Sequence, residues 1–463
     1  MTPSPTHDSP QPQTAQELET IAAISTAPGR GGIGIVRLSG SRARTIAEGM
    51  VTLGRPLEPA RVRFGHLVDP TTRDVMDEVV VTFFAAPHSY TSEDVVEIAM
   101  HGSPVLLNYA LERALEAGAR LAEAGEFTRR AFLSGRLDLT QAEAVRDLID
   151  ASTLHQARIA AQQMGGSLSH RIAPIKERLI ALIAGLEAGV DFAEDDIDTM
   201  PSAEIRARLE EVGVPLRELE RSFGYGRLVH EGLRLAIVGR PNVGKSSLFN
   251  RLVERDRAIV TPVAGTTRDL VTERVAIEGI PVELIDTAGL RETSDAIETI
   301  GITKSREAMA DADLVLIVID GASPEAHPED AGTLASLTGR PVLVAANKAD
   351  LGSATFALQP EVPIVRTSAV TGEGIAELRK SILATAGGSS QETALITNLR
   401  QRQAVTEALA ALKRAEEATD AGLPHEVLLV DLYDALGALD RLTGTTTADD
   451  ILYLIFSSFC IGK

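Results

Sequence analysis

The sequence predicts a multi-domain fold made of an N-terminal α+β domain, a discontinuous α-helical domain and an inserted α/β domain. Its 463 residues are enough for roughly two to four domains. Short apolar runs between turn residues give way near residue 135 to long Ala/Leu/Glu/Arg stretches, which indicates helices. Apolar runs then alternate with helical segments from 232 to 385, as in a mainly parallel sheet, before helical patterns return.

The boundaries follow from these changes in pattern. We expect a disordered tail at 1–18, an α+β domain at 19–134, a first helical part at 135–230, an α/β domain at 231–388 and a second helical part at 389–463. The tail is rich in Pro, Thr, Ser and Gln, so it buries too little apolar surface to offset the cost of ordering. Each helical part alone lacks partners for its apolar faces, so the two are predicted to form one domain.

The composition excludes several classes of protein. The net charge of −20 argues against broad, unspecific phosphate binding, so a nucleic-acid partner must meet a local basic patch. One cysteine excludes an internal disulfide and a Cys-rich zinc site, and the nine histidines show no metal-binding spacing. No apolar run approaches the roughly 20 residues of a membrane helix, and no secretory signal opens the chain. We expect a soluble, cytoplasmic protein.

Individual elements can be placed from residue patterns. In the N-terminal domain, Val79–Phe84 and Val95–Ile98 are typical of strands, and Leu106–Leu115 has helical spacing. Predicted strands of the α/β block are Leu233–Val238, Val282–Ile285, Leu314–Ile319, Val342–Ala345 and the run around Ile364 and Val365. Gly387–Ser390 is predicted to be a linker. Two apolar helical faces follow, formed by Val405, Ala408, Leu409, Leu412 and Ala415, and by Leu428, Leu432, Ala435, Leu436 and Leu439.

A phosphate-binding loop opens the α/β block. Gly239–Ser246 fits G-x-x-x-x-G-K-[ST], follows a predicted strand and opens a helix, which is the context that the motif requires. The glycines let backbone N–H groups close around phosphates, Lys245 supplies charge to the β/γ oxygens, and Ser246 offers its hydroxyl to Mg²⁺. The alternative is a chance glycine-rich turn.

Three further motifs follow in the order that a GTPase needs. Asp286-Thr287-Ala288-Gly289 ends a strand, and its carboxylate can reach Mg²⁺ while its glycine amide senses the γ-phosphate. Asn347-Lys348-Ala349-Asp350 ends another strand, and the Asp350 carboxylate can accept N1–H and the 2-amino group of guanine. Ser368-Ala369 can place an amide near guanine O6. Each motif alone could be a helix cap, but the four in register predict GTP rather than ATP.

Between the first two motifs lies a loop with the sequence Gly265-Thr266-Thr267-Arg268-Asp269. A threonine here can complete the coordination of Mg²⁺ when the γ-phosphate is present, and ordering of such a loop is a common switch. The alternative is a solvated Thr/Arg loop.

The order of these motifs resembles that of the bacterial translation-factor-like GTPases. The motifs are, in order, GRPNVGKSS, AGTTRD, DTAGLR, NKAD and SA. Leu290 occupies the position at which Ras-like proteins have a Gln that orients the attacking water. A leucine cannot orient water, so another group must assist catalysis. Asn242 is similar to the residue that holds K⁺ in cation-activated members, and such a cation can replace an arginine finger. The resemblance implies further K⁺ contacts at Thr261, Val263 and Thr266, and it leaves Thr267 for Mg²⁺.

The C-terminus ends in Cys460-Ile461-Gly462-Lys463, and a Cys-x-Gly-Lys end behind an inserted G domain resembles the MnmE/TrmE tRNA-modification GTPases. The match extends from about residue 20 through TAPGRGGIGIVRLSG, SYTSEDVVE and GEFTRRAFLSGRLDLTQAEA. The resemblance implies a homodimer formed by the N-terminal domains, with G domains that close across it when GTP and K⁺ bind. It also implies a flavoprotein partner, MnmG/GidA, which carries FAD. The two would add a carboxymethylaminomethyl or aminomethyl group to C5 of the wobble uridine (U34) of certain tRNAs.

The resemblance implies a site for a one-carbon carrier, 5,10-methylene- or 5-formyl-tetrahydrofolate, formed by Arg37, Glu97, Arg136 and Lys463, with Lys463 in reach of its own or the partner subunit's site. A carboxylate can accept from the N3–H and 2-amino groups of a pterin, and arginines suit its carbonyl and glutamate oxygens. The family has Lys where this chain has Arg136. Without the resemblance, Arg37, Glu97 and Arg136 would be interpreted as solvated surface charges.

Two further residues are catalytic candidates. Glu298 is implied to orient the attacking water in place of the missing Gln, although by itself it reads as an exposed helical Glu. Cys460 is either a nucleophile that adds to C6 of the uridine or a small buried residue of a final helix. The complete set predicted to bind GTP and its ions is Asn242, Val243, Gly244, Lys245, Ser246, Ser247, Thr261, Pro262, Val263, Ala264, Gly265, Thr266, Thr267, Asp286, Thr287, Ala288, Gly289, Asn347, Lys348, Ala349, Asp350, Ser368, Ala369 and Val370.

Two alternative functions remain open at this point. A ribosome-assembly switch GTPase would bind RNA without modifying it, but such proteins usually append a basic module to a G domain near one end. A folate-dependent methyltransferase with regulatory GTP would transfer a methyl group without the flavoprotein.

Overall fold

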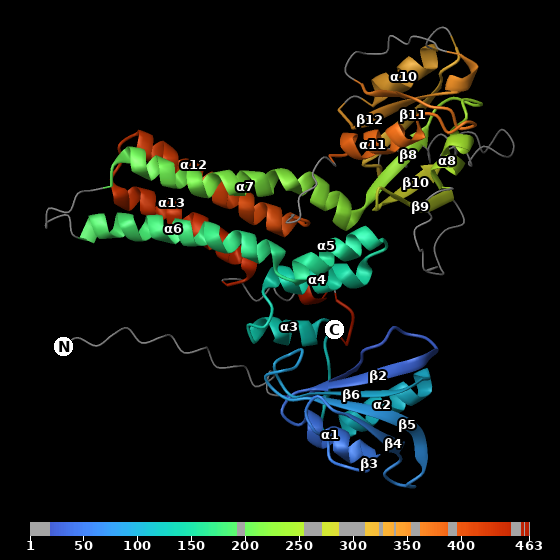
Figure 1. Cartoon of the computed structure of the whole chain (residues 1–463), viewed down its shortest axis with the longest axis vertical. Helices are drawn as coiled ribbons and strands as arrows, with labels where there is room; N and C mark the ends of the chain where they lie inside the picture. Colours follow the sequence, from blue (N-terminus) through green and yellow to red (C-terminus); the bar gives the residue numbers. More distant parts are fainter. Residues whose placement is uncertain are drawn as a thin grey trace. The chain divides into compact units, whose positions relative to one another are not determined.

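The computed structural model describes residues 19–191, 200–253, 271–286, 311–323, 327–337, 339–352, 362–387, 396–445, 455–457 and 459–462. These residues fall into two compact units (Figure 1). The first comprises the described parts of Met1–Glu143 and Gly444–Lys463, and the second lies within Ala144–Thr443.

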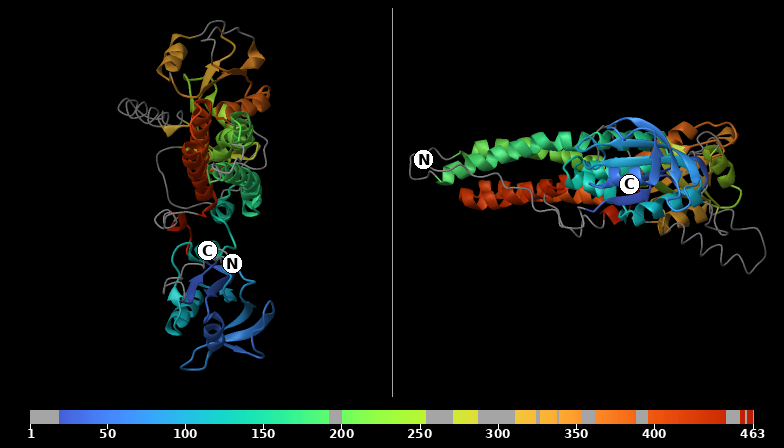
Figure 2. Two further views of the ribbon diagram at one scale, coloured as in Figure 1. Left: turned by 90° about the vertical axis from the view of Figure 1, so that its left-hand side faces the viewer. Right: turned by 90° about the horizontal axis from the view of Figure 1, so that it is seen from below.

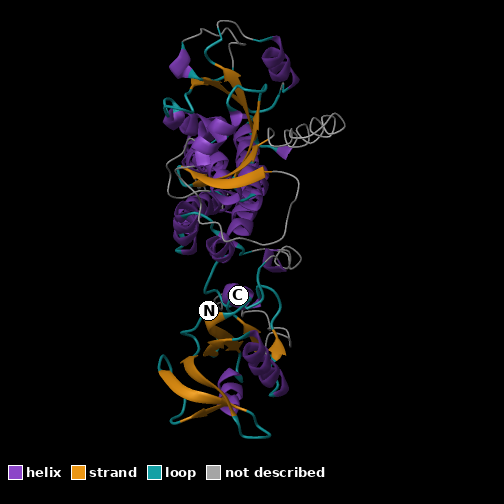
Figure 3. Cartoon of the chain, turned by 90° about the vertical axis from the view of Figure 1, so that its right-hand side faces the viewer, coloured by secondary structure: helices purple, strands orange, loops and turns teal. Residues whose placement is uncertain are grey.

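A seven-stranded sheet forms the first unit (Figure 3). Its strands are β1 (Ile21–Ile24), β2 (Gly31–Ser39), β3 (Val51–Leu53), β4 (Val62–Val68), β5 (Val75–Phe84), β6 (Val95–Gly102) and β7 (Arg120–Leu121). They lie side by side in the order β3-β4-β5-β6-β2-β1-β7. Neighbouring strands are antiparallel, except that β1 and β7 are parallel.

Helices α1 (Ala43–Met50) and α2 (Pro104–Glu116) pack against one face of this sheet and form a core with it. Along β6, Val96 and Ile98 point into this core, whereas Glu97 and Ala99 lie on the other face, as the two-residue period of a strand requires. Helix α3 (Glu126–Leu133) follows β7. The elements predicted in this region are confirmed, as strands at Val79–Phe84 and Val95–Ile98 and a helix at Leu106–Leu115.

The C-terminal segment lies in the first unit and not with the helices, to which the sequence pattern assigned all of 389–463. Ile461 forms a β-bridge with Ala124, and Ser25 Oγ donates to Gly462 O at 3.1 Å. Phe456 is buried and packs beside Phe132. A segment this short has no core of its own, so its pairing with distant strands decides where it belongs.

Long helices form one core of the second unit (Figures 1 and 2). They are α6 (Ser167–Asp191), α7 (Ser202–Glu231), α12 (Leu399–Asp420) and α13 (His425–Thr443), with the shorter α5 (Leu154–Met164) beside them. The two predicted apolar faces point inward, since Val405, Ala408, Leu412, Leu428 and Leu432 are all buried. Helices from both sides of the α/β block therefore build one discontinuous helical domain, as predicted. Helix α4 (Leu139–Asp150) precedes α5.

A six-stranded sheet forms the inserted α/β domain, in the order β13-β12-β11-β8-β10-β9. Its strands are β8 (Leu233–Val238), β9 (Val271–Ile277), β10 (Ile280–Asp286), β11 (Leu314–Asp320), β12 (Val342–Asn347) and β13 (Ile364–Arg366). All neighbouring pairs are parallel, except that β9 is antiparallel to β10. Helices α8 (Lys245–Val253), α10 (Pro328–Ser336) and α11 (Ile375–Thr385) accompany it, and the predicted α/β fold is confirmed.

Within the described part of the chain, no helix combines the length and apolar character needed to cross a bilayer.

Candidate functional site

The phosphate-binding motif lies in the loop between β8 and α8. Gly239 and Gly244 have φ of +146° and +95°, and Asn242, at +63°, also adopts the left-handed region. A Cβ on Gly239 would collide with the carbonyl oxygen of Val318. Lys245 is 8% exposed, and its Nζ donates to Arg240 O at 2.8 Å. The lysine amine therefore lies against the backbone of its own loop, whose glycine-rich N–H groups are of the kind that bind phosphate oxygens.

An ion pair that the sequence did not indicate anchors this loop. Arg240 donates through Nε and Nη2 to the two carboxylate oxygens of Asp330 on α10, at 3.0 and 3.1 Å. Asp330 is only 5% exposed, and its hydrogen bonds raise the pKa of Arg240 above the ordinary value. The fork geometry fixes the direction of the Arg240 side chain and so restrains the start of the loop.

Asn347, at the end of β12, joins three loops. Its Nδ2 donates to Val243 O in the phosphate loop at 2.9 Å, and its Oδ1 accepts from the Ala369 amide at 3.0 Å. Asn347 is 2% exposed, so these bonds are shielded from water. The structure thus brings together the phosphate loop, the Asn-Lys-Ala-Asp motif and the Ser-Ala loop.

The neighbouring side chains orient a carboxylate toward solvent. Ser368 Oγ donates to Asp350 Oδ1 at 2.6 Å, and Lys348 Nζ donates to Asp320 Oδ2 at 2.7 Å. Burial alone would raise the pKa of Asp320, but the hydrogen bond from Lys348 holds it below its ordinary value. Asp350 is exposed, so its carboxylate can accept hydrogen bonds from a planar base.

Arg251 of α8 is a second residue that the sequence did not indicate. It donates to Ala369 O at 3.0 Å and to Val370 O at 2.6 Å, and so ties the Ser-Ala loop to the helix that follows the phosphate loop. No motif marks this pair, because its members are more than a hundred positions apart.

Several predicted GTP-site residues lie outside the described residues. These are 261–267, 287–289 and Glu298. Asp286 is the last residue of β10, and its Cα is in register with Ile237 of β8. Its backbone therefore lies at the same carboxyl edge as the phosphate loop, where α/β sheets bind ligands.

A pocket of about 660 Å³ lies on the first unit. Its lining includes Tyr90, Glu97 and Arg136. Arg37 donates from Nε to Glu97 Oε1 at 2.9 Å and approaches the same oxygen through Nη2 at 2.8 Å. Arg136 Nη1 donates to Tyr90 O at 2.6 Å. The structure therefore places three of the four predicted folate residues in and beside one pocket.

The C-terminal residues reach this site within one chain. Arg37 Nη1 donates to Gly462 O at 3.4 Å, and the Gly125 amide donates to Cys460 O at 3.4 Å. Lys463 lies outside the described residues. Cys460 is exposed and belongs to no helix, so the alternative of a buried residue in a final helix is wrong. The pairing of this segment with Ala124 and Ser25 keeps the thiol at the surface.

The sheet face that carries Glu97 also carries exposed apolar residues. Phe64, Val80, Ala99 and Ile35 are successive cross-strand neighbours on β4, β5, β6 and β2. Phe64 is 58% and Val80 is 40% exposed. Exposed apolar rows of this kind are typical of surfaces that another molecule covers.

The phosphate loop, the Asn-Lys-Ala-Asp motif and the Ser-Ala loop meet at the carboxyl edge of a mainly parallel sheet, which defines a P-loop protein of the guanine-nucleotide-binding class. Two family models match the chain. They are "GTP-binding protein TrmE N-terminus" at 20–136 and "MnmE helical domain" at 139–460. The chain belongs to the MnmE/TrmE family.

Curated relatives agree along almost the whole chain. The tRNA modification GTPase MnmE of Koribacter versatilis is 59% identical over 450 residues, which cover 96% of this chain and 99% of that protein. Those of Symbiobacterium thermophilum and Aquifex aeolicus are 46% and 44% identical, and each match covers 96% of this chain. Among solved structures, the G domain of the T. maritima FeoB iron transporter is 29% identical and covers 33% of this chain and 98% of that one, with a TM-score of 0.25.

Proposed function

We propose that the protein is a GTPase that takes part in the modification of tRNA, at C5 of the wobble uridine. One observation carries the proposal: a chain 59% identical to a tRNA modification GTPase over 96% of its length holds both a guanine-nucleotide edge and a separate pocket lined by Glu97 and Arg136. The carboxyl edge of the α/β sheet would bind and hydrolyse GTP, and the pocket of the first unit would bind a second small ligand.

Each residue predicted at the nucleotide site has a physical role. Lys245 can exchange its bond to Arg240 O for the β/γ oxygens of GTP. Asp350, oriented by Ser368, accepts from N1–H and the 2-amino group of guanine. Ser246 and Thr267 would hold Mg²⁺, which neutralises phosphate charge, and Asp286 would reach it through water.

Hydrolysis needs a group in place of the missing Gln. We assign the charge-neutralising part to K⁺, held by Asn242, Thr261, Val263 and Thr266, and the orientation of water to Glu298. Asn242 lies in the phosphate loop with φ of +63°, a conformation that Asn tolerates and most residues avoid.

The pocket of the first unit suits a tetrahydrofolate. Its volume of about 660 Å³ is within the usual range for cofactor sites. Arg37 occupies only Oε1 of Glu97, so Oε2 remains able to accept from the N3–H and 2-amino groups of a pterin. Arg136 and Lys463 would hold anionic oxygens, and the carrier would supply the one-carbon unit.

The remaining parts of the reaction involve partners. The exposed thiol of Cys460 could add to C6 of the uridine and so activate C5. The FAD-carrying flavoprotein MnmG/GidA would supply the redox chemistry. A homodimer is supported by the apolar row of Phe64, Val80, Ala99 and Ile35, which a second copy would cover.

The decisive experiment is nucleoside analysis of tRNA from a strain that lacks the protein. We expect loss of the modified wobble uridine and its return with wild type, but not with Lys245→Ala or Glu97→Ala. Unchanged tRNA nucleosides together with unassembled ribosomal subunits would instead indicate a ribosome-assembly switch. A missing methyl group, restored without the flavoprotein, would indicate a methyltransferase.

The cation assignment has a separate test. GTP turnover should be much faster in K⁺ than in Na⁺, because the smaller ion fits the cage poorly. Asn242→Gly keeps the positive φ and removes the side chain together with its amide oxygen, so it should erase the difference while GTP still binds. Equal wild-type rates in both salts would refute the assignment.

A further inference from the structure

The pocket of the first unit takes much of its wall from the loop between β5 and β6. Ser89, Tyr90 and Ser92 of this loop line the pocket together with Glu97 and Arg136. The loop belongs to no helix or strand. Its shape therefore depends on side-chain contacts with its neighbours.

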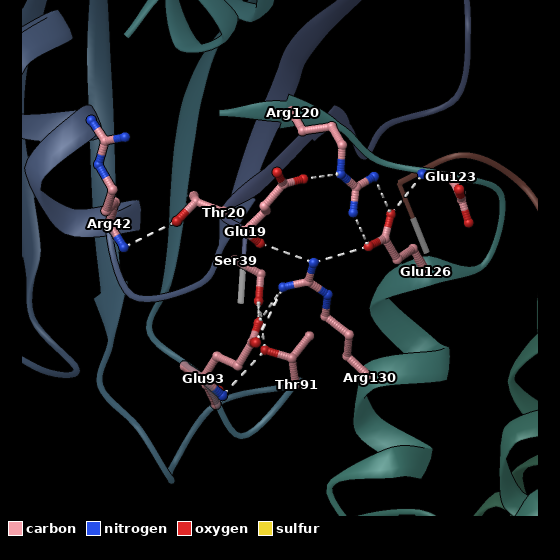
Figure 4. A network of polar contacts seen from close by, with 11 residues as sticks. Glu19, Thr20, Ser39, Arg42, Thr91, Glu93, Arg120, Glu123, Glu126 and Arg130 are labelled. Carbon is pink, nitrogen blue, oxygen red and sulfur yellow. Dashed lines mark hydrogen bonds and ion pairs between the residues drawn. The ribbon is translucent and has the colours of Figure 1, made fainter. Parts of the chain in front are cut away.

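Helix α3 supplies two of these contacts. The Tyr90 hydroxyl lies 2.9 Å from Thr128 Oγ1, and Arg130 Nη1 donates to both carboxylate oxygens of Glu93, at 3.1 and 2.9 Å. Ser39 of β2 donates to Glu93 Oε2 at 2.7 Å. Figure 4 shows the Glu93 carboxylate between the Ser39 hydroxyl and the Arg130 guanidinium. A carboxylate held by donors from a strand and a helix fixes the loop residues on either side of it.

Arg130 is itself held from its other side. Its Nη2 donates to Glu126 Oε1 at 2.9 Å and to Glu19 O at 3.0 Å, and Arg120 bridges the same Glu126 (Figure 4). Arg130 is 5% and Glu126 is 2% exposed. Burial alone would raise the pKa of Glu126, but hydrogen bonds from Arg120, the Glu123 amide and Arg130 keep it below its ordinary value. The position of the Arg130 guanidinium, which donates to Glu93, is therefore fixed by residues of the protein and does not depend on a ligand.

Tyr90 connects the loop between β5 and β6 to two charged residues in and beside the pocket. The guanidinium carbons of Arg136 and Arg37 lie 5.3 and 5.8 Å from the centre of its ring. Arg136 also donates to Tyr90 O at 2.6 Å. A displacement of Tyr90 would therefore move both of the arginines that are proposed to bind the ligand.

We propose that the ion pair between the half-exposed Glu93 and the buried Arg130 positions the loop from Ser89 to Asp94, and through Tyr90 sets the places of Arg37 and Arg136 for a tetrahydrofolate ligand. The inference rests on the proposed folate function and deepens it. Neither Glu93 nor Arg130 is among the described residues that line the pocket, so both are positioning residues and not ligand contacts.

The test is calorimetric binding of 5-formyltetrahydrofolate to the full-length chain. Glu93→Gln keeps the size of the side chain and removes the charge that Arg130 grips. It should raise the Kd by on the order of tenfold or more, as misplacement of binding groups does. Glu93→Asp, which keeps the charge, should recover part of the affinity, and GTP affinity should be unchanged in both.

Arg120→Gln is the matched control. It removes a charge from the same network at the end remote from the pocket loop, where Arg120 contacts Glu126 and Glu19. We expect it to lower thermal stability as Glu93→Gln does, but to leave the Kd unchanged. An equal rise in Kd for both variants would mean that the pair only stabilises the fold, and the positioning inference would be wrong.

Two further outcomes are decisive. If Glu93→Gln does not fold, Thr128→Val removes only the partner of the Tyr90 hydroxyl. It should also raise the Kd, and an unchanged Kd would overturn the inference. If the wild-type chain does not bind 5-formyltetrahydrofolate, the folate proposal and this inference are both wrong. If wild type and Glu93→Gln bind it with the same low Kd, only the inference is wrong.

Discussion

Replacement of Gly279 by Ala tests how firmly the β9–β10 hairpin is held. Glu278 and Gly279 form its two-residue turn, with φ of +50° and +83°. Thr153 Oγ1 donates to Gly279 O at 2.6 Å, and a Cβ on Gly279 would come within 2.6 Å of the Cβ of His155. The hairpin connects the segment containing Thr267 with Asp286, so a firm turn restrains the backbone between two parts of the predicted Mg²⁺ site.

The chain offers a control with the same backbone strain. Gly339 has φ of +84°, but no described atom lies within 4 Å of the position of its Cβ. Gly339→Ala should therefore cost only the left-handed backbone term, about 1–2 kcal/mol. Gly279→Ala adds an overpacked contact with His155 worth about 1–3 kcal/mol, which gives about 2–5 kcal/mol in total.

Amide hydrogen exchange followed by mass spectrometry measures the local effect, which a global melt of a multi-domain chain would average out. We expect exchange of the β9–β10 amides to accelerate in Gly279→Ala by roughly tenfold more than exchange around residue 339 does in Gly339→Ala, since 1.4 kcal/mol corresponds to tenfold. Equal accelerations would show that the contact between α5 and the hairpin contributes nothing, and the reasoning would be refuted.

Three other predictions concern the nucleotide site and one junction between helices. Asp350→Asn should weaken GTP binding by about 1.5–3 kcal/mol and favour xanthosine triphosphate, whose base offers an acceptor where guanine has a donor; an unchanged base preference in a competition assay would contradict the assigned contact. Glu298→Ala should leave GTP affinity nearly unchanged and raise the barrier to hydrolysis by about 2–4 kcal/mol, whereas a large loss of affinity would make Glu298 structural. The hydrogen bond that His230 Nδ1 donates to the Asp147 carboxylate raises the pKa of His230 above 6.5, so this pair should stabilise the fold fully below pH 6.5 and lose its effect as pH rises through the folded-state pKa. Hydrogen exchange of the α4 and α7 amides in wild type and His230→Gln, compared at several pH values, measures this, and a constant difference between the two proteins would exclude the linkage.

The fold of the inserted domain could be predicted because its signals are local. Leu233–Val238 is an apolar run followed at once by the phosphate-loop motif, and it forms β8 with the same bounds. Asn347 is the last residue of β12 and Ser368 comes two residues after the end of β13, and parallel strands place such ends at one edge. Their convergence needs no information from distant parts of the chain.

The supports of the site could not be predicted in this way. Arg240 and Asp330 are 90 positions apart, and Arg130 and Glu93 are 37 apart. All four are Arg, Asp or Glu residues, which are mostly exposed to solvent in proteins. From the sequence alone they would therefore be predicted to be exposed surface charges. Only packing shows that Asp330 and Arg130 are buried and must be paired.

The amino-acid order by itself determined the classes of the domains and the strand ends that carry the nucleotide motifs. Through resemblance, it also gave the residues predicted around the pocket of the first unit. Periodicity and short motifs act within a few residues, so a linear chain records them. The tertiary structure alone decided that the C-terminal segment joins the first unit, that Cys460 is exposed and that Gly462 lies beside Arg37. These facts depend on which distant surfaces exclude water together, and that is a property of the folded chain and not of any local pattern.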